Sequence, residues 1–211
     1  MTKFVLIRHG YSEFNHLKKF AGQLDVALTP LGVRQAEITG EYILKNYQID
    51  AVYASDLSRA IDTAKPVANA LGLPVHTDKR LRELDVGVWT NMFFTQVREQ
   101  YAVEYAEYRN GGCCLGGESM AQLQTRAVQA LRDIASLHEN QTVLVASHGG
   151  TIRAILRFVY GYSLEEMNKL PIVPNNSITE LYFDKGAFEV GLFAYEDHLI
   201  SLKTEQDKHL L

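Results

Sequence analysis

Two histidines in this chain each follow a short apolar run and precede a glycine. The runs are Phe4-Val-Leu-Ile-Arg-His9-Gly10 and Val143-Leu-Val-Ala-Ser-His148-Gly149. A run of this kind is typical of a buried parallel strand, and open α/β sheets bind ligands at the carboxyl ends of such strands. If the two strands are neighbours, His9 and His148 face one crevice. Arg8 lies beside His9, so we expect this crevice to attract anions.

An imidazole in an anion-binding crevice is a candidate nucleophile for phosphoryl transfer. It can form a covalent intermediate with phosphorus, which divides one difficult displacement into two steps. The transferred group needs positioning and charge stabilisation, and arginine suits this because its planar fork binds phosphate through two hydrogen bonds. We therefore predict His9 as the nucleophile. The predicted phosphate and substrate contacts are Arg8, Asn15, Gln23, Arg59, His148 and the backbone N–H groups at the helix start after Gly149-Gly150.

The leaving oxygen must also be protonated, so a general acid is expected near the nucleophile. Glu83 is a candidate, because it follows the apolar segment 74–77 and opens a less regular region. From the residues alone, the favoured interpretation of Glu83 is a surface carboxylate paired with Arg80 or Arg82. A metal site, the other use of paired histidines, fits poorly because Arg8 would repel a cation and no ligand cluster lies nearby. We expect no metal.

The elements that would position these residues alternate along the chain. Apolar patterns predict strands at 2–7, 49–54, 74–77 and 142–147, and a final hairpin at 178–183 and 188–195. Helical spacing predicts helices that begin at Thr29-Pro30, near 57, near 120 and after 150. This alternation predicts a three-layer α/β/α fold with a mostly parallel sheet and one antiparallel edge strand. We expect one domain over 1–211, with a helical or loop insertion at 85–118 that forms a lid.

Composition narrows the class of partner. The chain has 211 residues, 46% of them hydrophobic and 22% charged, with a formal net charge of −4. These values are ordinary for a globular protein and leave no basic footprint for nucleic acid. The apolar stretch from Phe4 to Ile7 is too short for a signal-peptide core, so we expect a cytoplasmic protein without membrane contact. Cys113 and Cys114 are adjacent and are expected to be reduced thiols, and a homodimer is left open.

Several blocks of this sequence resemble the histidine phosphatase superfamily, the phosphoglycerate mutase-like group. The resemblance covers nearly the whole chain. The similar blocks are 6–15 (LIRHGYSEFN), 22–25 (GQLD), 28–32 (LTPLG), 53–60 (YASDLSRA), 81–83 (LRE), 117–119 (GES) and 147–153 (SHGGTIR). The resemblance implies that His9 is phosphorylated and that Glu83 is the proton donor. It also implies a phosphate pocket of Arg8, Arg59 and His148, further contacts from Asn15, Gln23 and the Gly149 amide, and no cofactor.

The same pocket can serve a phosphatase or a mutase. The segment Gly87-Val-Trp-Thr-Asn91 departs from the family's Gly-x-Trp-Glu-Gly, and the Asn-Glu-Arg-His-Tyr-Gly stretch of glycolytic mutases is missing. Between 85 and 118 the basic residues are Arg98 and Arg109, whereas the acids are Asp85, Glu99, Glu104, Glu107 and Glu118. A net negative, aromatic lid is poor for a second phosphate or carboxylate.

The prediction is therefore a metal-independent phosphoric monoester hydrolase that acts through a phosphohistidine on small phosphorylated metabolites. A broad specificity or a ring-bearing substrate such as α-ribazole phosphate is the expected range. The alternatives are a phosphotransferase of the phosphoglycerate mutase type and, less favoured, a non-catalytic module that binds phosphate or a partner.

Overall fold

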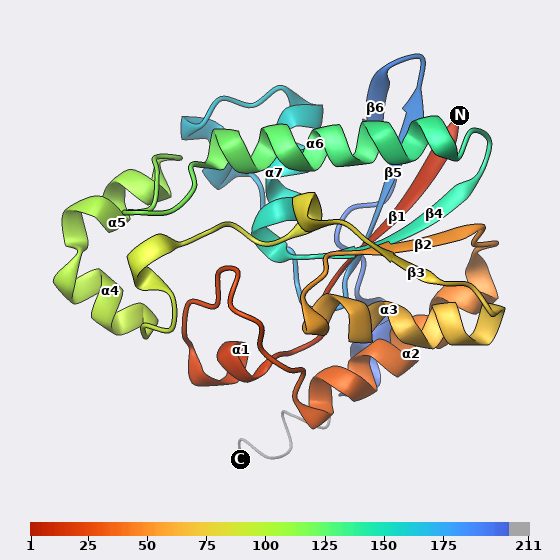
Figure 1. Ribbon diagram of the computed structural model, residues 1–211, viewed down its shortest axis with the longest axis horizontal. Coiled ribbons are helices and arrows are strands. Elements are labelled where there is room, and N and C mark those ends of the chain that lie inside the picture. The colour runs from red at the N-terminus through yellow and green to blue at the C-terminus, as the bar shows by residue number, and fades with distance from the viewer. Residues whose placement is uncertain (203–211) are drawn as a thin grey trace.

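The computed structural model describes residues 1–202, and its centre is a six-stranded sheet in the order β3-β2-β4-β1-β5-β6 (Figure 1). The strands are β1 (Thr2–Arg8), β2 (Ala51–Ala54), β3 (Val75–Thr77), β4 (Thr142–Ser147), β5 (Ile178–Asp184) and β6 (Ala187–Val190). The first four strands along the chain, β1 to β4, run parallel to one another, which confirms the mostly parallel sheet. The strand that runs against them, β5, lies one place in from the edge, because its hairpin partner β6 forms the edge itself.

Helices cover both faces of this sheet. They are α1 (Glu13–Leu17), α2 (Pro30–Asn46), α3 (Ser58–Leu71), α4 (Phe94–Gln100), α5 (Ala102–Arg109), α6 (Met120–Leu137) and α7 (Gly149–Tyr160). One face is packed by α6 and α7 and the other by α2 and α3 (Figure 1), so the three-layer fold is confirmed. Helix α2 begins as predicted, because the Thr29 side chain accepts a hydrogen bond from the Gly32 amide and Pro30 follows it.

The apolar run of β1 is continuous because both of its faces are buried. Phe4 and Leu6 belong to the core under α6 and α7, whereas Val5 and Ile7 belong to the core under α2 and α3. Successive strand side chains point to opposite faces, so a strand covered on both sides has no polar alternation. This packing holds the carboxyl end of β1, and therefore the start of the candidate site, in a fixed position.

The insertion predicted at 85–118 is present and lies beside the sheet, on the left of Figure 1, as α4 and α5. It has its own small core around Trp89, which is fully buried. The rings of Tyr101, Tyr105 and Tyr108 surround this indole, with centroids 6.4, 6.1 and 5.5 Å away. Within residues 1–202, no helix combines the length and the apolar character needed to cross a membrane.

Candidate active site

The ends of β1 and β4 bring the two histidines together. The strands are neighbours, with Arg8 opposite Ser147 in the register, so the next residue on each strand is a histidine. The rings of His9 and His148 have centroids 5.1 Å apart and an interplanar angle of 62°. Both side chains are buried, His9 with 5% and His148 with 0% exposure. The two His-Gly strand ends therefore meet as expected, and His9, but not His148, lines the cavity at this place.

The ring of His9 is held in one tautomer. Its Nδ1 lies 2.8 Å from the carbonyl oxygen of Gly10. A carbonyl only accepts, so Nδ1 carries the proton and the lone pair is on Nε2. Burial, followed by the positive charges of Arg59 and Arg8, lowers the pKa of His9 well below its ordinary 6.5. At neutral pH this imidazole is neutral and its Nε2 is available as a nucleophile.

Two arginines flank the histidines: Arg59 is buried and Arg8 is half-buried. Arg8 donates from Nη1 to the Val173 carbonyl at 2.6 Å, and Arg59 donates to the carbonyls of Leu24 and Gly22 at 2.8 and 2.9 Å. Burial lowers the pKa of Arg59 to about 10, so its guanidinium remains charged at neutral pH. These bonds fix both forks against the surrounding loops. A rigid pair of cations at this position favours a bound anion.

Several polar atoms at this point have no partner among the described residues. They include Nε of Arg8, Nε of Arg59 and both ring nitrogens of His148. A buried polar group without a hydrogen bond destabilises the folded protein by about 1–3 kcal/mol. A ligand that supplied the missing partners would recover this stability. An oxyanion would accept from the two guanidinium N–H groups and from His148. The unpartnered donors therefore support the interpretation of this crevice as a phosphate pocket.

The N-terminus of α7 completes the anion cradle. His148 is the N-cap residue of this helix, and Gly149 and Gly150 are its first residues. A Cβ at Gly149 would lie 3.1 Å from Nε of Arg8, so glycine permits the close approach of the helix backbone to that arginine. Helix N-termini attract anions because their first N–H groups are unpaired and the helix dipole is positive there.

Glu83 faces this pocket. Its carboxylate accepts hydrogen bonds from the amides of Leu84 and Gly150, at 2.9 and 3.1 Å. Arg80 pairs with Asp78 and Asp133, and Arg82 pairs with Asp56. The interpretation of Glu83 as a surface carboxylate paired with Arg80 or Arg82 is therefore wrong, because other carboxylates occupy both arginines.

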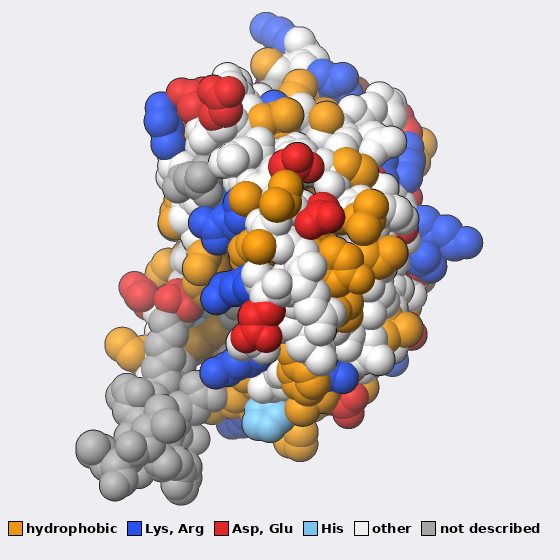
Figure 2. Space-filling model, turned by 90° about the vertical axis from the view of Figure 1, so that its left-hand side faces the viewer, with side chains coloured by type: hydrophobic (Ala, Val, Ile, Leu, Met, Phe, Trp, Pro, Cys, Tyr) orange, Lys and Arg blue, Asp and Glu red, His pale blue; other side chains and the backbone are white. Residues whose placement is uncertain are grey.

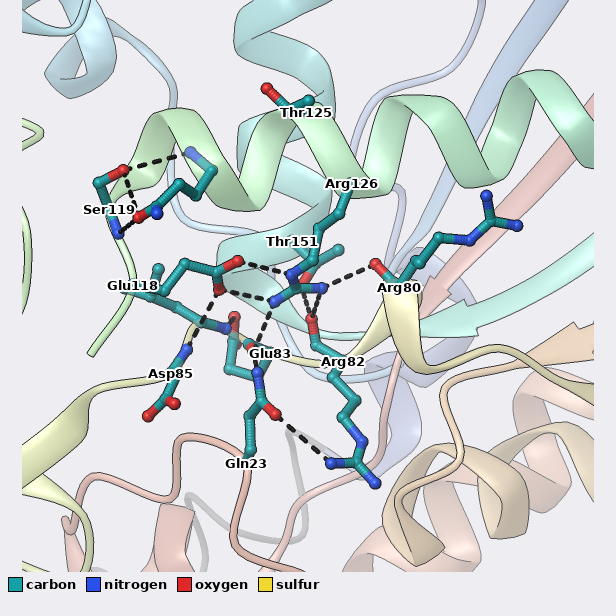
Figure 3. Close-up of polar contacts among 12 residues, drawn as sticks. Gln23, Arg80, Arg82, Glu83, Asp85, Glu118, Ser119, Thr125, Arg126 and Thr151 are labelled. Atoms are coloured by element: carbon teal, nitrogen blue, oxygen red, sulfur yellow. Dashed lines mark hydrogen bonds and ion pairs between the residues drawn. The ribbon is translucent and has the colours of Figure 1, made fainter. Parts of the chain in front are cut away.

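Arg126 of α6 holds the segment that carries Glu83 (Figure 3). Its guanidinium donates to the carbonyls of Arg80 and Arg82 at 2.7 Å each and of Glu83 at 2.9 Å. The same group binds the Glu118 carboxylate through Nε and Nη2, at 2.7 and 2.8 Å. Sequence reasoning missed Arg126, because an arginine on an amphipathic helix usually faces solvent. Its guanidinium instead fixes the backbone from which the Glu83 side chain extends into the pocket.

The two predicted amide side chains have different positions. Asn15 lines the cavity of His9, and its Oδ1 accepts from the Ser12 amide at 3.0 Å and from Asn175 at 3.2 Å. Gln23 does not line that cavity. Its amide donates to the Glu83 carbonyl at 3.3 Å and accepts from Arg82 at 3.4 Å, in a neighbouring hollow (Figure 3). The structure therefore does not bring Gln23 into the pocket, because these two contacts turn its side chain away.

The cavity around His9 has a volume of about 250 Å³. It also contains residues to which sequence reasoning gave no role, among them Lys19, Tyr108, Arg153 and Val173. Asn175 was missed as well, and its side chain donates to the His9 carbonyl at 2.8 Å. Arg153 could have been found from the sequence, because it follows Gly149 by one helical turn and so lies on the same face of α7.

Within 1–202, no group of three or more His, Cys, Asp or Glu residues is placed to hold a metal ion.

Comparison with known proteins identifies the family. A family model described as histidine phosphatase superfamily (branch 1) matches residues 4–195. This chain belongs to that superfamily. It is 32% identical over 169 residues to phosphoserine phosphatase 1 of Hydrogenobacter thermophilus, covering 79% of this chain and 80% of that protein. It is 30% identical over 204 residues to phosphoglycerate mutase-like protein 4 of Arabidopsis thaliana, covering 94% and 87%.

Solved structures agree with this histidine phosphatase assignment. The phosphoserine phosphatase of Entamoeba histolytica, solved as a mutant in complex with phosphoserine, matches with a TM-score of 0.83 and 30% identity. That match covers 94% of this chain and 100% of the other. The predicted family and fold class are confirmed, and the relatives named as phosphatases support a phosphoric monoester hydrolase.

The lowered pKa of His9 predicts the acid limb of the pH profile of this histidine phosphatase. Protonation of His9 removes the lone pair on Nε2, so activity falls as pH decreases through the pKa of the folded protein. Burial and the two arginines place that pKa well below 6.5. We expect kcat/KM for an aryl phosphate to stay on its plateau at pH 6.5 and to decline only at clearly lower pH. A pH-rate profile of the free enzyme checks this, and a midpoint at or above 6.5 would contradict it.

Proposed function

We propose that the protein hydrolyses small phosphomonoesters through a phosphorylated His9, without a metal ion. The observation that carries this proposal is the neutral, buried imidazole whose Nε2 lone pair is free between two fixed arginines and a helix N-terminus. Arg8, Arg59, His148 and the Gly149 amide are the phosphate contacts of the proposal. Glu83 is its proton donor.

The reaction proceeds in two displacements. Nε2 of His9 attacks phosphorus, the bond from phosphorus to the ester oxygen breaks, and that oxygen takes the proton of Glu83. The alcohol leaves, and a water then attacks the phosphohistidine while the Glu83 carboxylate accepts the proton of that water. The P–N bond breaks, inorganic phosphate departs and His9 recovers its lone pair. Throughout, the arginines offset charge on the three non-bridging oxygens.

The relatives support hydrolysis of small phosphorylated metabolites. Two of them are named for phosphoserine phosphatase activity and one for its likeness to phosphoglycerate mutases. The alternative of a phosphotransferase therefore remains the second candidate function. The proposal includes two candidate substrates, which are phosphoserine and a ring-bearing ester similar to α-ribazole phosphate. The cytoplasmic location and the possible homodimer stay predictions.

Trapping the intermediate tests the proposal. The protein is mixed rapidly with an aryl phosphate in the presence of a chelator, quenched in alkali and digested. We expect a burst of phenol that matches the enzyme concentration, and a phosphoryl group on the peptide that contains His9. Phosphohistidine is labile in acid, so an acid quench should lose the label.

The other outcomes of this experiment separate the alternatives. Label on a serine or aspartate peptide, or loss of turnover with the chelator, would contradict the mechanism. When the aryl phosphate is replaced by phosphoglycerate, a labelled His9 with isomerisation faster than release of phosphate would assign the phosphotransferase instead. Tight binding of phosphate with neither turnover nor label would indicate a non-catalytic module.

A further inference from the structure

A second and larger cavity adjoins the pocket of His9 on the side of α4 and α5. Its volume is about 560 Å³, and we call it the outer cavity. The two cavities share the lining residues Phe20, Phe94, Tyr108, Met120, Arg153 and Ile172. A phosphomonoester whose phosphate lies beside His9 would therefore extend its leaving group into the outer cavity.

The charged side chains of the outer cavity are all positive. Arg98 of α4, Arg109 of α5 and Arg153 of α7 line it, and no acidic residue in the described part of the chain does. The five acids counted in the insertion are not among its lining residues. Asp85 and Glu118 line the neighbouring hollow that contains Gln23, and Glu118 is bound by Arg126. The count of charges in the insertion predicts a lid that is poor for a second anion, whereas the charged side chains that line the outer cavity are basic.

Arg153 connects the outer cavity with the phosphate pocket. It donates from Nη2 to the Leu170 carbonyl at 3.2 Å, which fixes one side of its guanidinium. Burial, together with the positive charge of Arg109, lowers its pKa, whereas the charge of Glu83 raises it. Arg153 thus lies within electrostatic reach of both the lid arginine and the proton donor. An anion between Arg109 and Arg153 would relieve their mutual repulsion.

The walls of the outer cavity are aromatic. Phe20 and Phe94 form an edge-to-face pair with centroids 4.6 Å apart, and the Tyr105 and Tyr108 rings are 6.0 Å apart. The guanidinium of Arg98 lies 5.7 Å from the centre of the Tyr105 ring. On the face of the molecule that carries α4 and α5, hydrophobic side chains are interspersed with basic and acidic ones (Figure 2). Such walls favour a flat apolar group with a negative charge beyond it.

We propose that the outer cavity binds a leaving group that carries a second anionic group, a carboxylate or a phosphate, on a flat apolar body. This substrate class rests on the proposed phosphatase function and narrows it. Arg109 and Arg153 are the residues that select the second anion, and the aromatic pairs hold the body of the leaving group.

Matched substrates test this selectivity. The set is 4-methylphenyl phosphate, 4-(carboxymethyl)phenyl phosphate and 4-(phosphonomethyl)phenyl phosphate. A methylene separates each charge from the ring, so the leaving phenols have similar acidity. We expect kcat/KM to be about tenfold or more higher for the anionic substrates than for the neutral one, since hydrogen bonds to charged groups are the strong ones. The better of the two anionic substrates shows which anion the cavity prefers.

Variants assign the selectivity to the arginines. Arg109→Gln and Arg153→Gln are each expected to reduce the preference for the anionic substrate about tenfold, with a smaller change for 4-methylphenyl phosphate. The matched control is Arg34→Gln on α2, since Arg34 is exposed, pairs with Glu37 and lines neither cavity. It should leave the preference unchanged.

A binding measurement separates this inference from the proposed function. Calorimetry of the wild-type protein with 4-hydroxyphenylacetate and with 4-methylphenol, both in the presence of phosphate, needs no turnover. Tighter binding of the carboxylate, lost in Arg109→Gln, supports the outer cavity even if hydrolysis fails. Equal binding of the two phenols, or equal kcat/KM for all three substrates, would overturn the inference while the phosphatase function stands.

Discussion

Replacement of His9 by alanine is expected to reduce turnover of an aryl phosphate by a factor on the order of 10⁵. The variant lacks the Nε2 lone pair, so no phosphoenzyme forms and water would have to attack the ester directly. The anion cradle remains, because Arg8 and Arg59 are held by the carbonyls of Val173, Leu24 and Gly22. Initial rates measure the loss, and calorimetry should show that inorganic phosphate still binds.

A second histidine provides the control for this substitution. His76 on β3 is exposed and lies outside the cavity of His9, so His76→Ala should keep full activity. Both variants should show the circular dichroism and unfolding temperature of a folded protein. If His9→Ala lost phosphate binding together with activity, the loss would report a collapsed pocket. If it kept most of its turnover, His9 would not be the nucleophile.

Glu83→Gln is expected to affect slow leaving groups far more than fast ones. An alkoxide needs a proton as it departs, and glutamine cannot supply one, so kcat/KM for an alkyl phosphate should fall about 10³-fold. The 4-nitrophenolate ion leaves without protonation, so the loss for 4-nitrophenyl phosphate should be about tenfold or less. Phosphate affinity should not weaken, because the substitution removes a negative charge whose field reaches Arg8 and Arg59. The measurement is the ratio of kcat/KM for the alkyl phosphate to kcat/KM for 4-nitrophenyl phosphate, in the wild-type protein and in Glu83→Gln.

The control for Glu83 comes from the lid. Glu107 of α5 is exposed and lines neither cavity, so Glu107→Gln should change neither rate. An equal loss for both leaving groups in Glu83→Gln would contradict proton donation. It would instead indicate that Glu83 matters through its hydrogen bonds to the amides of Leu84 and Gly150.

The elements of this protein were predictable because their signals are local. An apolar run specified β1, and Thr29 with Pro30 specified the start of α2. The left-handed residue Gly72, with φ of 64°, ends α3, and glycine is the residue that adopts this conformation most easily. Helix caps and strand periodicity depend on neighbours within a few residues, so a single sequence contains them.

The position of the anionic side chains was not predictable in the same way. The residues alone favoured Glu83 as a surface partner of Arg80 or Arg82, and only the family resemblance implied a proton donor. In the structure, Asp78, Asp133 and Asp56 pair with those arginines. Which carboxylate meets which guanidinium depends on contacts between distant segments. Arg126, for example, binds the Glu83 carbonyl across a sequence separation of 43 residues.

By itself the sequence determined the two His-Gly strand ends, the flanking Arg8 and Arg59, and a three-layer α/β fold to carry them. Only the tertiary structure decided that β1 and β4 are neighbours and that Glu83 faces the pocket while Gln23 turns away. It also decided that the arginines of the insertion, and not its glutamates, line the outer cavity. The reason is physical: the order of residues fixes the charge of a segment, whereas packing fixes the direction in which each charge points.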